Sequence, residues 1–96
     1  MLAEKALRNA TTFPKGTLPV TLPTGAGVVL IYDASSQPWV AIAEPNLGVG
    51  IVSAIDNPTL SAGFKSYAYF PTATFRAAEQ ERDSIINRRL VSGQIP

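Results

Sequence analysis

Three acidic side chains gather near the C-terminal end of the sequence, where they could bind a metal ion or transfer protons. They are Glu79, Glu81 and Asp83. In a helix, Glu79 and Asp83 are one turn apart and share a face, whereas Glu81 points elsewhere. Magnesium is bound through several oxygen ligands, and a third ligand is missing from this face. The pattern is more typical of a solvated, charged helix face, so we expect no metal and no cofactor.

Three arginines in the same stretch are the candidates for binding phosphate groups. Arg82 and Arg89 are seven residues apart and share a helical stripe, and Arg88 adjoins Arg89. So few charges bind DNA weakly at physiological salt, and the helix dipole by itself favours cations near a helix C-terminus. We therefore expect no nucleic-acid partner, with weak nucleic-acid binding through these arginines as an alternative.

Aromatic side chains provide the candidates for contacts with another protein. Trp39, Tyr67 and Tyr69 could stack on bases only if basic residues lay among them, and Lys65 alone is close in sequence. Tyrosine and tryptophan are enriched in protein interfaces. Together with Leu2, these three residues predict contacts with a protein partner or with a second copy of the chain.

The composition excludes several kinds of chemistry. The 96 residues include no histidine and no cysteine, which excludes Ser–His catalysis, thiol nucleophiles, disulfides and zinc ribbons. A net charge of +1 gives no strong general attraction to nucleic acid. The first 12 residues lack the apolar core of a signal peptide, and prolines and glycines interrupt the least charged stretch. We therefore expect a cytoplasmic or virion-associated protein with no membrane contact.

The chain is predicted to form one domain over residues 1–96. We expect an N-terminal arm over 1–15 with a short helix at 2–9, a Pro/Gly-rich connector over 16–25 with an edge strand at 17–22, a sheet region over 26–70, and a C-terminal helix within 72–92, centred on 74–90. Thr72 or Thr74 is the expected cap of that helix, and Gly93 the expected stop. Its core-facing residues should be Phe75, Ala78, Ile85, Ile86 and Leu90.

The sheet region divides into two strands joined by a turn, an ambiguous element and a further strand. Residues 26–33 form a continuous β-branched and apolar run, which predicts a strand covered on both faces. A turn at 33–37 joins it to a second strand at 39–43. Residues 63–70 alternate, with Tyr67 and Tyr69 on one face. Residues 46–55 fit a strand or a helix, and their two glycines favour the strand.

This order of elements predicts the α+β class. We expect a small sheet of three to four strands, mostly antiparallel, with a short N-terminal helix and a long C-terminal helix.

Several segments resemble the GIY-YIG nuclease domain over about residues 22–95. Val28-Val29-Leu30-Ile31-Tyr32-Asp33 after Gly27 resembles the first strand of that family, and Trp39-Val40-Ala41 stands at its second motif. Pro45-Asn46-Leu47 resembles the segment that follows, and Glu81 with Ile85-Ile86 resembles the helical glutamate and its apolar pair. The resemblance implies the order strand–strand–helix–strand–helix, which would make residues 46–55 helical.

The chain departs from the family at the positions that carry its chemistry. Val29 and Trp39 stand where the family has tyrosines, Ala41 stands at a glycine, and residues 48–51 lack the expected arginine. The resemblance therefore implies a non-catalytic relative, with a divergent metal-dependent nuclease using Glu81 or Glu79 as the alternative. We expect a non-enzymatic structural or accessory protein that acts through protein contacts, in the setting of a larger assembly such as a virion or phage tail.

Overall fold

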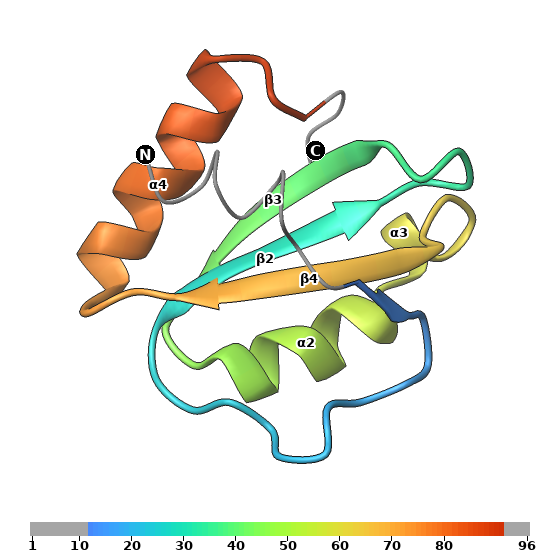
Figure 1. Cartoon of the computed structure of the whole chain (residues 1–96), viewed down its shortest axis with the longest axis horizontal. Coiled ribbons are helices and arrows are strands. Elements are labelled where there is room, and N and C mark those ends of the chain that lie inside the picture. Colours follow the sequence, from blue (N-terminus) through green and yellow to red (C-terminus); the bar gives the residue numbers. More distant parts are fainter. Residues whose placement is uncertain (1–11, 92–96) are drawn as a thin grey trace.

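A computed structural model of the chain describes residues 12–91 (Figure 1). The expected N-terminal helix at 2–9, Leu2 and the stop at Gly93 lie outside this range. The elements are β1 (Phe13–Pro14), β2 (Gly27–Tyr32), β3 (Pro38–Glu44), α2 (Leu47–Ile55), α3 (Pro58–Ser61), β4 (Ser66–Pro71) and α4 (Phe75–Asn87). The strands form one antiparallel sheet in the order β1-β4-β2-β3. The predicted α+β class is confirmed.

Strand β2 lies at the centre of the fold, and all six of its residues are buried. It pairs with β3 on one side and β4 on the other. Helix α4 covers one face of the sheet, and α2 and α3 lie on the opposite face (Figure 1). The side chains of β2 alternate between two apolar clusters, with Val28, Leu30 and Tyr32 toward α4 and with Val29 and Ile31 toward α2. The prediction of a strand covered on both faces is confirmed.

The hairpin between β2 and β3 turns over the five residues predicted for it. The Asp33 carboxylate accepts hydrogen bonds from the backbone N–H of Ser35 (2.9 Å) and of Gln37 (3.0 Å). An aspartate that caps its own turn in this way fixes the loop. Ser36 completes the turn in the left-handed region, at φ 60°.

Residues Leu47–Ile55 form a helix, so the preference for a strand drawn from the two glycines was wrong. Asn46 caps it by accepting a hydrogen bond from the Val49 N–H (3.2 Å). The glycines allow close packing: a Cβ on Gly48 would lie 2.8 Å from the Pro23 carbonyl oxygen, and one on Gly50 would collide with the Glu44 side chain. Contact between elements therefore overrides the low helix propensity of glycine. From β2 onward the order is strand–strand–helix–helix–strand–helix, which differs from the order that the GIY-YIG resemblance implies by the additional short helix α3.

The expected edge strand at 17–22 is absent, and the edge of the sheet is occupied by β1 instead. Pro19 and Pro23 have no backbone N–H, so the connector cannot form a continuous ladder. It crosses beside α2 as an irregular loop (Figure 1). The Tyr67 hydroxyl donates a hydrogen bond to the Thr17 carbonyl (2.5 Å), and the Leu47 N–H donates one to the Gly25 carbonyl (2.8 Å).

Helix α4 begins where the sequence predicted and ends three residues early. Thr74 caps it by accepting a hydrogen bond from the Ala77 N–H (3.0 Å). At the far end Arg89 adopts φ 55°, and the Leu90 N–H donates to the Ile85 carbonyl (3.0 Å). A left-handed residue followed by such a backbone hydrogen bond ends a helix. Helix α4 therefore ends at Asn87, before the apolar residues Leu90 and Val91.

The core-facing side of α4 follows the prediction in part. Ala78 and Ile85 are buried, and Leu90 packs against their cluster. Ile86 is half-buried. Phe75 is 40% exposed, contrary to expectation, because it occupies the first turn of the helix, beside the loop that leaves β4.

Substitution of Gly48 tests whether close packing explains the glycine. We expect Gly48→Ala to destabilise the domain by about 1–3 kcal/mol, because the added methyl must displace the Pro23 carbonyl. The same change in an ordinary helix interior stabilises by about 1 kcal/mol. Urea unfolding measures the sign, with Ser53→Ala on the exposed side of the same helix as the control. A stabilised Gly48→Ala variant would contradict the packing explanation.

Candidate functional site: an apolar face on helix α2

Helix α2 is apolar on its outer side as well as its inner side. Its nine residues, LGVGIVSAI, include no charged side chain. Leu47, Ile51 and Ala54 are buried against the sheet, whereas Val49 is 62% exposed and Val52 is 40% exposed. A helix that is hydrophobic all round is normally buried. The outer side of α2 therefore has the character of a buried surface without being covered by the described residues.

The connector extends this apolar surface beside the helix. Leu18, Val20 and Leu22 are all exposed, and Val20 is fully so. Leu22 lies beside Pro23, Val49 and Val52 along α2, and we call these four residues the α2 face. The face also lacks positive charge, because the sequence has no basic residue between Lys15 and Lys65. Isolated apolar side chains are common on protein surfaces, but a contiguous group of this kind marks an interaction site.

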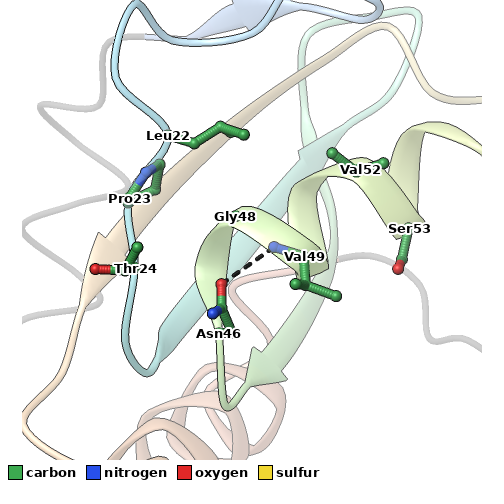
Figure 2. Close-up of a pocket in the computed structure, with 8 residues that line it drawn as sticks. All are labelled: Leu22, Pro23, Thr24, Asn46, Gly48, Val49, Val52 and Ser53. Carbon is green, nitrogen blue, oxygen red and sulfur yellow. Dashed lines mark hydrogen bonds between the residues drawn. The ribbon is translucent and has the colours of Figure 1, made fainter.

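A shallow groove runs along the α2 face between the connector and the helix (Figure 2). Its volume is about 370 Å³, and its walls are Leu22, Pro23, Thr24, Asn46, Gly48, Val49, Val52 and Ser53. None of these side chains is charged. Such a groove can accept apolar side chains by excluding water, and the few polar groups at its rim can orient a backbone. Its polar side chains are Thr24, Asn46 and Ser53, and no carboxylate, lysine or arginine lines it.

Glu44 places an acidic side chain beside α2. It ends β3, opposite Gly27, and its side chain packs against Gly50. Burial raises the pKa of Glu44 above its ordinary value. The carboxylate is therefore held at the base of the helix at some cost, and it lies outside the residues that line the groove.

The aromatic residues predicted to contact a partner lie largely inside the fold. Tyr67 is completely buried, stacked on Phe13 with ring centroids 5.4 Å apart. Tyr69 stacks on the same ring at 6.0 Å and is half-buried, as is Trp39. The alternation of β4 was predicted correctly, but α2, α3 and β1 cover the face that carries the tyrosines. Because Tyr67 has no exposed surface, it is not available for the partner contact that the sequence predicted for it.

The carboxylates of α4 do not come together as a metal site. Residues 12–91 contain no group of three or more acidic residues that could hold an ion. Asp83 pairs with Arg82 at 3.0 Å, and Glu79 and Glu81 are half-buried. One Glu81 oxygen is buried with no hydrogen-bond partner, as is the Tyr32 hydroxyl, whose pKa burial raises.

The positions that the GIY-YIG resemblance would assign to one site lie on two sides of the sheet. Val29 is fully buried, and its side chain packs in the cluster beneath α2. Glu81 belongs to α4, which packs on the opposite face. The remaining candidates, Arg88 and Arg89, are exposed at the end of α4. Within residues 12–91, the positions that the resemblance assigns do not bring a carboxylate, an arginine and a hydroxyl into one cleft.

Comparison of the chain with models of protein families, with curated proteins and with solved structures found no match. Among the described residues, no helix is both long enough and apolar enough to cross a membrane. Any assignment of function must therefore come from the geometry of the chain itself.

Sequence reasoning missed the valines and the leucine of the α2 face, although a signal was present. Val49 and Val52 stand in a run that also carries Leu47, Ile51 and Ile55. On a helix such a run is apolar on more than one side, whereas on a strand it reads as ordinary alternation. The choice between strand and helix thus decided whether an exposed apolar face could be recognised.

The raised pKa of Glu44 predicts a pH-dependent effect on stability. Because its folded-state pKa lies above the unfolded value, protonation favours folding: the benefit is present below the unfolded pKa and is lost as the pH rises through the folded pKa. We expect Glu44→Gln to raise the Tm at pH 7 by about 1–2 °C. The difference from wild type should shrink toward zero near pH 3.5. Thermal unfolding at the two pH values measures it, and a lower Tm for the variant at pH 7 would contradict the assignment.

Proposed function

We propose that this chain is a non-enzymatic structural or accessory subunit that acts through protein–protein contacts, and that the α2 face receives the partner. The observation that carries the proposal is the exposure of Leu22, Val49 and Val52 around one groove that no charged side chain lines. Burial of such side chains contributes roughly 25 cal/mol per Å² of apolar area removed from water. A partner that covers them gains that stabilisation without desolvating a charged group in the groove.

The groove selects for apolar side chains carried on a regular backbone segment. It is open along its length between the connector and α2, and its lining side chains are short (Figure 2). A helix that presents apolar residues at positions i, i+3 and i+4 matches this shape. An uncharged groove also disfavours a strongly charged ligand, which supports a protein partner over nucleic acid.

A subunit of a larger assembly, such as a virus particle or phage tail, is the setting we propose, with a cytoplasmic or virion-associated location. In an assembly the α2 face would be covered permanently. We further propose that the chain is a non-catalytic relative of the GIY-YIG domain. Apart from α3, the order of its elements supports this relation, and the residues at Val29, Trp39 and Gly48–Ile51 support the loss of catalysis.

The α2 face is tested by charged substitutions at its two exposed valines. We expect Val49→Asp combined with Val52→Asp to reduce partner binding at least tenfold, because each aspartate would have to lose its hydration in an apolar contact. The tagged full chain is purified from the cells that naturally make it. Partner-to-chain ratio and molar mass are then measured, with Thr59→Asp combined with Ser61→Asp on the exposed side of α3 as the control.

The proposal requires a fixed partner ratio for the wild type and the control, and its loss for the double valine variant with an unchanged circular dichroism spectrum. Equal ratios for all three chains would contradict the assignment of the face. Magnesium-dependent cleavage of DNA or RNA by the wild type that is abolished by Glu81→Gln would overturn the non-enzymatic assignment.

A further inference from the structure

Strand β3 forms an edge of the sheet that no described strand covers. The order β1-β4-β2-β3 gives β3 one neighbour, β2, within residues 12–91. At seven residues, β3 is the longest of the described strands, and its middle, Val40-Ala41-Ile42-Ala43, is wholly apolar. An edge of this kind presents a row of unpaired backbone groups to any other strand.

The hydrogen bonds of β2 fix which backbone groups of β3 point outward. The Thr72 N–H donates to the Ala26 carbonyl (2.9 Å), which places the even-numbered groups of β2 on the β4 side. The Asp33 N–H donates to the Gln37 carbonyl (3.0 Å), which places the odd-numbered groups on the β3 side. Val29 is opposite Ile42 and Ile31 is opposite Val40.

The backbone groups of Val40, Ile42 and Glu44 therefore face β2. Because the direction alternates along a strand, those of Ala41 and Ala43 face away from the sheet.

The usual protections of an edge strand are present only at the two ends of β3. Pro38 begins the strand, and the register with β2 shifts between Ile31 and Tyr32, which places a bulge at Trp39. Glu44 closes the other end. Prolines, charged residues and bulges prevent edge strands from pairing with another chain. Residues 40–43 contain none of these three features.

We infer that β3 pairs with β3 of a second copy of the chain, antiparallel and about a two-fold axis at Ile42. This register sets Ala41 opposite Ala43 of the second copy and Ala43 opposite its Ala41. Each is a hydrogen-bonded pair that exchanges two bonds, so four hydrogen bonds use every outward-pointing N–H and C=O of Ala41 and Ala43. The two Ile42 side chains face each other on the α2 side of the sheet, where Ile42 is half-buried.

Charge and shape favour a second copy over an unrelated strand. Val40 falls opposite Glu44 of the second copy, so the two carboxylates are offset by four residues, roughly 13 Å. That separation exceeds the Debye length of about 8 Å at physiological ionic strength. Ala41 and Ala43 are small and face α4, so the new pair adds no bulk beneath that helix. The contact uses none of the residues of the α2 face, and it stands independently of the proposed function.

Cysteine cross-linking tests the register directly, because the chain has no cysteine of its own. Opposite residues of a non-hydrogen-bonded pair have Cα atoms about 4.5 Å apart, within the range of about 4.4–6.8 Å that a disulfide requires. We expect the full-length Ile42→Cys chain to form a disulfide dimer under mild oxidation, at least fivefold faster than Glu44→Cys. Equal rates for the two chains, or no dimer from Ile42→Cys, would overturn the inference.

A charge exchange at the same position separates loss of pairing from loss of folding. Ile42→Lys and Ile42→Glu should each be monomeric by light scattering, because like charges directly opposite repel. An equimolar mixture should recover the dimer mass, since lysine then faces glutamate. Thr59→Lys and Thr59→Glu, on the exposed side of α3, are the matched controls and should keep the wild-type mass both alone and mixed. A wild-type chain that stays at 10.2 kDa at every concentration, or a mixture that stays monomeric, would contradict pairing through β3.

Discussion

The burial of β2 on both faces is the constraint on which the rest of the structure depends. Six consecutive buried residues require a strand on each side and a covering layer above and below. The chain meets this requirement by placing α4 on one face and α2 with α3 on the other, while β3 and β4 complete the hydrogen bonds (Figure 1). A domain this small has little apolar sequence left over, so its other surfaces are covered less completely.

Residues 12–91 leave two of those surfaces uncovered, and each results from the way the elements pack around β2. Helix α2 can approach Glu44 and the connector only because Gly48 and Gly50 carry no side chain. This close approach brings Leu22 and Pro23 beside Val49 and Val52, which creates the groove. At one edge of the sheet, the two residues of β1 cover β4. At the opposite edge, β3 has no described strand on its outer side. Both open surfaces are apolar, and we propose that both serve protein contacts.

The sequence predicted the parts of the fold that local patterns determine. The uninterrupted run in β2, the aspartate that fixes the Asp33–Gln37 turn and the threonine at the start of α4 each act over a few residues, so they could be read directly. The helix at Leu47–Ile55 could not, because its glycines are explained by contacts with Pro23 and Glu44, which are distant in sequence. The burial of Tyr67 likewise depends on distant residues, because the rings of Phe13 in β1 and of Phe64 contact it. The α2 face was missed for the same reason, since its valines become a surface only once the helix and connector are placed.

The most direct measurement of the central claim, that open surfaces of this domain serve protein contacts, is amide hydrogen exchange of the wild-type chain at low and high protein concentration. At low concentration the amides of Ala41 and Ala43 should exchange quickly, because they point away from β2, whereas those of Val40 and Ile42 should be protected. At high concentration all four should be protected to a similar degree, with β2 unchanged. Rapid exchange of Ala41 and Ala43 at both concentrations would contradict the claim for the β3 edge.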